Sequence, residues 1–242
     1  IFLGIIAGIP GTLRSNFTQL DTIEKAVFLL MTFVLIVSVV YITEAQRKVK
    51  VQYSRRVRAG GAMDSYIPIK IVQFGVMPVI FAVSLLSFPQ LIGKFILSRD
   101  MSDQVIEFTT KAMALIDNPY FNNIVTFLLI VGFSFFYLTV VFKTDELAEN
   151  LQKQGGFIPG IRPGKNTSEY LRKVAFRLAS LGAIFLGLIS ILPSVLNPLL
   201  FPNGNVVPII TGTGLLIMVN VVLDVRRQVE SMIVVRDYDR YL

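Results

Sequence analysis

The sequence has 242 residues, of which 53% are apolar and only 16% are charged. Soluble domains carry about 25% charged residues, so these charges would be too few to cover a water-exposed surface, whereas lipid requires no such cover. The composition therefore favours a membrane protein, and the absence of His and Cys excludes histidine-ligated haem, thiolate metal sites, disulfides and Ser-His-Asp triads.

The amino-terminal residues 1–9 are uncharged and are followed by Pro10 and Gly11. We expect them to be the end of a truncated transmembrane helix, with an outer loop over 10–25. Neither an initiator Met nor a charged segment, as in a signal peptide, stands ahead of this stretch. We therefore expect the sequence to begin within a longer protein.

Four longer stretches carry no charged side chain, at 26–43, 71–93, 118–142 and 178–223. About 20 apolar residues cross the hydrocarbon layer, so each of the first three predicts one transmembrane helix. The last stretch has 46 residues, and its prolines and asparagines are expected to divide it into spans at 178–192 and 206–225, joined by an outer loop at 193–205. The predicted fold class is all-α: a polytopic membrane helix bundle with five complete transmembrane helices plus the end of a sixth.

Basic residues alternate between the segments that join these spans. Segments 44–70, 143–177 and 226–242 hold 18 Lys and Arg, whereas 10–25, 94–117 and 193–205 hold five. The positive-inside rule places the first group in the cytoplasm, together with the carboxyl-terminal tail, and makes 94–117 an outer loop.

The apolar stretches have no acidic or basic residue near their centres. Ion-coupled transporters usually keep one there, so a coupled pump is disfavoured, and we expect no catalytic residue, cofactor or metal. Pro78 is expected to bend the helix at 71–93, and Asn220 to hydrogen-bond a neighbouring helix in packing rather than to bind a ligand. The Gly212-Thr213-Gly214 run alone does not make a nucleotide site.

The first basic segment has the pattern of a hairpin. Residues 48–53 alternate strictly, which sets Lys48 and Lys50 on one face and apolar side chains on the other, and 65–71 is again extended after a Gly60-Gly61 turn. Further basic side chains stand between the strands: Arg55, Arg56 and Arg58. These charges could only fix topology and contact anionic lipid, but a protruding hairpin favours a surface for a partner, including RNA phosphate.

The second basic segment combines a short helix with a rigid loop. Thr144-Asp145-Glu146 predicts a helix start, and the helix should run to Lys153. Four Gly and two Pro between 155 and 164 constrain the loop that carries Arg162 at its tip, although it could be only a connector. A capping box of Asn166 and Glu169 is expected to restart the helix.

Several motifs together resemble the C-terminal half of the bacterial SecY family, the pore subunits of the Sec protein translocase. They are the segment 155–164 with Phe-Ile-Pro-Gly-Ile-Arg-Pro-Gly, the hairpin around 52–56, Gly-Val-Met-Pro-Val-Ile-Phe at 75–81 and Gly-Thr-Gly-Leu-Leu-Ile at 212–217. The resemblance covers nearly the whole chain, from the end of the family's fifth helix through its tenth.

The resemblance implies a passive, gated protein-conducting channel that passes unfolded polypeptides across, and membrane proteins into, the bacterial plasma membrane. By position, the family's pore ring corresponds to Ile1, Ile80 and Ile217, and its lateral gate to Ser84, Phe88 and Phe133. Its motor- or ribosome-docking surface corresponds to Arg162, Arg55, Arg56, Arg58, Lys48 and Lys50.

The partners that the resemblance implies are SecE and SecG subunits, the SecA motor or the ribosome, signal peptides and nascent chains, membrane lipid, and the missing N-terminal half of the same protein. Half of a small-molecule secondary transporter is the alternative, and it would need polar or charged substrate contacts at the membrane midplane.

Overall fold

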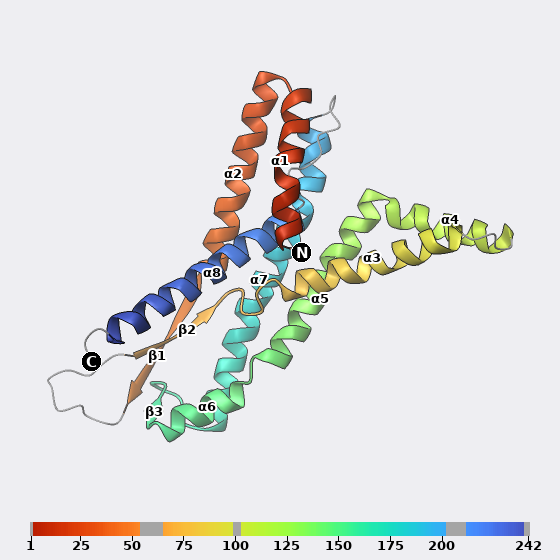
Figure 1. Cartoon of the computed structure of the whole chain (residues 1–242). Helices are drawn as coiled ribbons and strands as arrows, with labels where there is room; N and C mark the ends of the chain where they lie inside the picture. Colours follow the sequence, from red (N-terminus) through yellow and green to blue (C-terminus); the bar gives the residue numbers. More distant parts are fainter. Residues whose placement is uncertain (1, 54–64, 99–102, 202–211, 240–242) are drawn as a thin grey trace.

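The computed structural model describes residues 2–53, 65–98, 103–201 and 212–239. Within these ranges the chain forms helices and three short strands (Figure 1). In order they are α1 (Phe2–Gln19), α2 (Thr22–Glu44), β1 (Gln46–Tyr53), β2 (Ser65–Lys70), α3 (Met77–Leu97), α4 (Asp103–Asp117), α5 (Pro119–Val141), α6 (Thr144–Lys153), β3 (Gly156–Phe157), α7 (Lys165–Leu200) and α8 (Gly212–Asp239).

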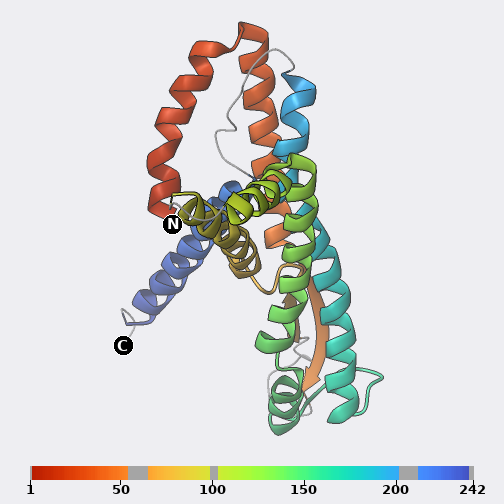
Figure 2. The ribbon, with the colours of Figure 1, turned by 90° about the vertical axis from the view of Figure 1, so that its right-hand side faces the viewer.

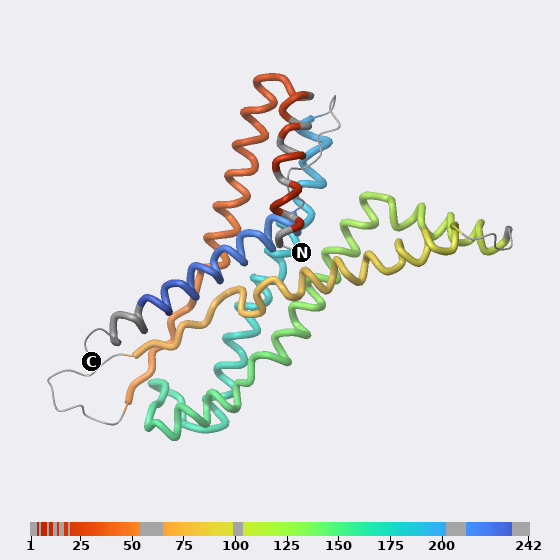
Figure 3. Tube along the Cα trace, viewed as in Figure 1, coloured from red at the N-terminus to blue at the C-terminus, as the bar shows by residue number. Residues whose placement is uncertain are grey.

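The 36-residue helix α7 forms the spine of the molecule. Helix α5 packs along it, and α2 and α8 contact it nearer its carboxyl end (Figure 2). The strands and α6 gather at its amino-terminal end, while α3 and α4 extend together to one side (Figure 3). The basic segments and the apolar helices therefore occupy different ends of the molecule.

By length and composition, four helical stretches of the described residues could cross a membrane: Thr22–Glu44, Met77–Leu97, Pro119–Lys153 and Lys165–Leu200. Each contains most of one predicted span. The fifth predicted span, 206–225, is described only from Gly212, where α8 begins. Helix α8 then continues to Asp239 through charged residues, so only its first part is apolar.

The main hydrophobic core lies where five helices meet. Each contributes a side chain with no exposed surface: Val39 from α2, Val79 from α3, Ile130 from α5, Leu186 from α7 and Leu216 from α8. Because lipid is as apolar as these side chains, close van der Waals packing holds such helices together in a membrane. Small residues on α7 permit it; for example, a Cβ on Gly187 would lie 2.5 Å from the ring of Phe127.

Prolines end fewer helices than the sequence predicts. Helix α1 continues through Pro10 to Gln19, and α7 continues through Pro193 and Pro198 to Leu200. The predicted loop at 10–25 and the break at Pro193 are therefore wrong. A proline removes one backbone hydrogen bond, whereas unwinding a helix in an apolar setting would leave several backbone groups without partners.

The segment 71–93 is not helical throughout. Residues 71–76 form an irregular turn in which Gly75 has φ +59°, and α3 begins only at Met77, so that Pro78 stands in its first turn. Pro78 therefore starts the helix and does not bend it, because its missing N–H lies where a helix has no internal acceptor. The predicted outer loop 94–117 is largely helical in the described residues, since α3 extends to Leu97 and α4 occupies 103–117.

The two strands of the predicted hairpin are present and pair, while the segment that joins them lies outside the described residues. Strands β1 and β2 pair antiparallel with Val49 opposite Ile67, and β3 adds to the other edge of β1. Helix α6 spans Thr144–Lys153, as predicted from its acidic first turn. The capping box is wrong: α7 begins at Lys165 after Gly164, and the backbone turn at Gly164, with φ +96°, takes the place of the Asn166 cap.

Candidate functional site

One sheet joins the two basic segments, 44–70 and 143–177. Strand β1 lies in the middle, with β2 on one edge and β3 on the other, so that Gln52 stands opposite Phe157. The sequence predicted the strands of the hairpin but gave no sign that the second segment would add to it, because a two-residue strand has no readable period. The sheet and the loop 158–164, which carries Arg162, are called the docking face below.

The docking face has its own hydrophobic core. Val49 and Val51 point from β1 onto buried side chains of the second segment and of α7, namely Leu151, Ile158, Leu171 and Val174. The opposite face of β1 leaves Lys48 and Lys50 exposed. The alternation that predicts the strand therefore also separates its packed face from its basic face.

The loop before α7 is held by glycines and one side-chain contact. Gly155, Gly160 and Gly164 all have positive φ, between +70° and +96°, a region that other residues rarely adopt. The Thr167 hydroxyl donates a hydrogen bond to the Arg162 carbonyl oxygen at 3.0 Å. Arg162 itself is exposed, so a fixed backbone presents its side chain to solvent.

Three of the six residues predicted for docking lie on this face: Lys48, Lys50 and Arg162. The others, Arg55, Arg56 and Arg58, lie outside the described residues, as does the Gly60-Gly61 turn.

The proposed pore positions lie on two contacting helices. Ile80 is half-buried on α3, and Ile217 is 8% exposed on α8. Gly212 permits the close approach of α8 to α7, because a Cβ there would clash with the Ser190 carbonyl oxygen of α7. Ile1 lies outside the described residues.

The proposed gate positions are not equivalent. Ser84 and Phe88 are exposed on α3, whereas Phe133 on α5 is half-buried and its ring stacks on Phe81 with centroids 6.0 Å apart. Phe81 also approaches Tyr137, with centroids 6.4 Å apart. Sequence reasoning missed Phe81 as a contact between α3 and α5, although it ends the motif at 75–81.

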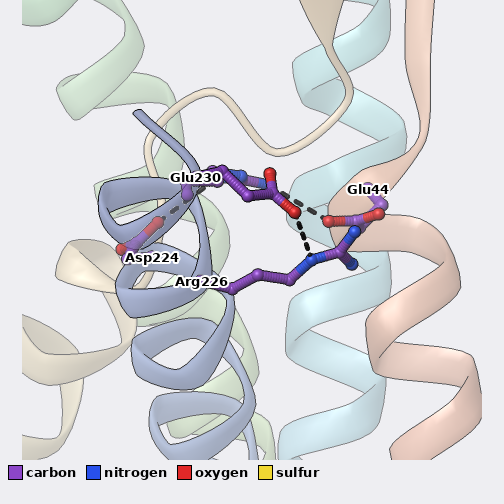
Figure 4. A network of polar contacts seen from close by, with 5 residues as sticks. Glu44, Asp224, Arg226 and Glu230 are labelled. Atoms are coloured by element: carbon purple, nitrogen blue, oxygen red, sulfur yellow. Dashed lines mark hydrogen bonds and ion pairs between the residues drawn. The ribbon is translucent and has the colours of Figure 1, made fainter. Parts of the chain in front are cut away.

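A polar network that the sequence did not predict links α8 to the end of α2 (Figure 4). Arg227 Nη1 lies 3.3 Å from Asp224 Oδ1, and Arg227 Nη2 lies 3.9 Å from Glu44 Oε1. Burial, and then the nearby Arg227 charge, lower the pKa of Lys70, while Asp224 and Glu44 oppose that shift. Pairs as exposed as these contribute about 0–1 kcal/mol, so the network adds little to the stability of the fold.

Helix α8 also carries an exposed ion pair between Arg226 and Glu230. Arg226 Nε lies 2.8 Å from Glu230 Oε1, and this hydrogen bond raises the pKa of Arg226 (Figure 4).

Uncharged polar side chains line a cavity of about 480 Å³ between α3, α5, α7 and the start of α8. Asn123 Nδ2 donates to Ser194 Oγ at 3.1 Å across it, and among the described residues the buried Ser190 Oγ has no partner. A polar cavity of this size can hold water. Asn220, by contrast, is buried and donates to the Leu216 carbonyl oxygen at 2.9 Å, so its hydrogen bond lies within its own helix and not to a neighbour.

Within the described ranges, no group of three or more acidic side chains could hold a metal ion. The arrangement there includes apolar spans, the polar cavity at Asn123 and Ser194, and a basic docking face.

Comparison with known proteins gives one consistent result. The family model described as SecY matches residues 1–226. "Protein translocase subunit SecY" of Mycobacterium leprae is 38% identical over 253 residues, covering all of this chain and 56% of the relative. The protein of the same description from Streptomyces griseus is 40% identical over 252 residues, again covering all of this chain and 56% of the relative.

Solved structures share the fold. One, described as "The structure of a protein conducting channel", superposes with a TM-score of 0.59 at 18% identity over 91% of this chain and 52% of that one. A second, on the plug domain of the SecY protein, gives 0.60 at 19% identity over 94% and 58%. The chain thus spans a little more than half the length of the proteins it matches.

Proposed function

The chain belongs to the SecY family of multi-pass membrane proteins, and from this premise we propose that it forms one half of a passive channel for unfolded polypeptides. The match over residues 1–226 carries the proposal, because it includes the helices that hold Ile80 and Ile217 as well as the docking face. The proposal includes passage of secretory chains across the bacterial plasma membrane and of membrane proteins into it.

The distribution of charge supports a conduit without its own energy source. The described apolar helices have no acidic or basic side chain near their centres, and aliphatic side chains such as Ile80 and Ile217 suit a narrow seal. Such a constriction dewets and blocks ions without binding a passing chain. No catalytic residue or cofactor is needed for this role.

The docking face supports a mechanism in which a bound partner supplies the energy that moves the polypeptide. A basic hairpin and a rigid loop on one sheet give a partner a defined surface, which Arg162 extends. We assign this face to the cytoplasm on the charge count, and the SecA motor or the ribosome to it as partners. SecE and SecG are the proposed companion subunits.

The names of the relatives favour a protein-conducting channel. They do not favour the alternative, in which the chain is half of a small-molecule secondary transporter. The cavity at Asn123 and Ser194 has polar lining residues, but its described lining includes no acidic or basic residue of the kind that ion-coupled transporters usually keep.

Ion conductance of the intact channel in planar bilayers tests the proposal. Ile80→Asn combined with Ile217→Asn should make the resting channel leak ions, because polar side chains keep the constriction wet. Val222→Asn is the control, since Val222 lies on α8 and is 54% exposed. Equal tightness of the double variant and the wild type would reject the pore assignment.

A further inference from the structure

A second cavity, of about 330 Å³, lies where the apolar part of α5 ends and α6 begins, against the side of α7. Its floor is apolar and is formed by Leu138, Ala175 and Phe176. Its rim carries charges of both signs: Lys143 and Arg172, and Asp145 and Glu146. Neither the pore nor the docking face described above uses this cavity.

The cations of the rim are well placed to meet an anion. The Arg172 guanidinium lies over the Phe176 ring at 5.7 Å from its centroid, and that ring stacks on Phe135 with centroids 6.3 Å apart. Lys143 Nζ lies 2.8 Å from Glu146 Oε1, and this hydrogen bond raises the pKa of Lys143. A guanidinium and an ammonium that line one cavity can both contact the oxygens of a phosphate group.

The carboxylates of the rim are equally defined. Asp145 accepts a hydrogen bond from the Ser168 hydroxyl at 2.5 Å, which holds it at the start of α6, and Glu146 is held by Lys143. A ligand that carried only negative charge would meet these two carboxylates unfavourably. The cavity therefore suits a ligand with a cation close to its anion.

The level of the cavity indicates a lipid as the source of that ligand. Lys143 directly follows the uncharged stretch 118–142, and Arg172 precedes the stretch that begins at 178 by six residues, or about 9 Å of helix. This is about the thickness of the headgroup layer. On α5, Phe136 is one helical turn from the lining residue Thr139, and Phe136 and Val140 are 62% and 56% exposed, so this helix offers an exposed apolar surface to acyl chains.

We propose that this cavity binds the headgroup of a zwitterionic phospholipid with a primary ammonium, its phosphate against Arg172 and Lys143 and its ammonium against Asp145 and Glu146. The site requires a chain that lies in a membrane but does not require that the chain conducts polypeptides. Failure of one proposal therefore leaves the other standing.

Native mass spectrometry of the intact, delipidated protein with defined lipids tests the site. Phosphatidylethanolamine should be retained in preference to phosphatidylglycerol, which lacks the ammonium, and soluble phosphoethanolamine should not displace it. Arg172→Ala should weaken retention by about tenfold, the loss that corresponds to one hydrogen bond to a charged group. Arg177→Ala is the matched control, being an exposed arginine of α7 outside the cavity.

Glu146→Gln supplies a second, conservative variant. It is exposed and should leave the melting temperature unchanged while removing the preference for phosphatidylethanolamine over phosphatidylglycerol. Equal retention of the two lipids by the wild type, or equal losses in the Arg172 and Arg177 variants, would overturn the proposal.

Discussion

The carbonyl oxygen of Ile71 lies 2.7 Å from the position that a Cβ on Gly182 would occupy. This approach brings the irregular turn at 71–76 directly against the backbone of α7. Val72 and Phe74 from the same turn are buried in the main core. The start of α3, and with it the position of Ile80, therefore depends on the absence of a side chain at 182.

Gly182→Ala should destabilise the protein by about 1–3 kcal/mol, because a rigid backbone atom must move to admit the methyl group. Gly132→Ala on α5 is the matched control, since a Cβ there would meet nothing within 4 Å. That change should be neutral or stabilising by up to about 1 kcal/mol. Thermal unfolding in detergent measures both, and equal melting temperatures for the two variants would contradict the close approach.

A disulfide should form across the sheet when Gln52→Cys is combined with Phe157→Cys. The two residues are directly opposed partners of β1 and β3, and opposed Cα atoms in antiparallel strands lie about 4.5–5.5 Å apart, within the range a disulfide spans. The chain has no native Cys to interfere.

The control for this pair is Lys48→Cys with Phe157→Cys, because Lys48 lies four residues, or about 13 Å, farther along β1. Mass spectrometry after thiol alkylation distinguishes the two outcomes. Similar cross-linking of both pairs would show that the two basic segments do not share one sheet.

Arg162→Glu should reduce motor-dependent translocation into vesicles without a change in stability above about 0.5 kcal/mol, because Arg162 is exposed and its loop is fixed through the backbone. Lys111→Glu makes the same charge change in the predicted outer segment, where Lys111 is exposed, and should leave translocation intact. Normal translocation by the Arg162 variant would remove it from the docking face.

Much of the fold can be predicted from patterns along the sequence. Uncharged stretches locate the apolar helices, the alternation at 48–53 predicts β1, and the acidic first turn at Thr144 predicts α6. Each of these signals depends on residues that are neighbours in the sequence. The pairing of Gln52 with Phe157 could not be predicted because it depends on contacts between distant segments.

The roles of individual prolines and glycines also depend on contacts between distant segments and could not be predicted from the sequence. Pro78 and Pro193 look alike in sequence, yet Pro78 stands at the start of a helix and Pro193 lies within one. The outcome depends on whether the backbone groups freed by unwinding would find hydrogen-bond partners in the packed structure. Gly212 looks like part of a loop motif, but it permits α8 to pack on Ser190.

The candidate site was predictable only in part. The pore and gate positions came from the resemblance alone, since an isolated Ile in an apolar helix carries no signal of its own. The stacking of Phe81 on Phe133 and the Arg227–Glu44 contact arise from tertiary packing, and no sequence period points to either.

The central claim is that a polypeptide passes beside Ile217 and Ile80. Site-specific photo-cross-linking measures this directly: a photoreactive residue is placed at each position in the intact channel, with a secretory chain stalled midway across the membrane. We expect cross-links from 217 and 80 and none from the exposed position 222 on the same helix as Ile217. Cross-links from 222 but none from 217 or 80 would contradict it.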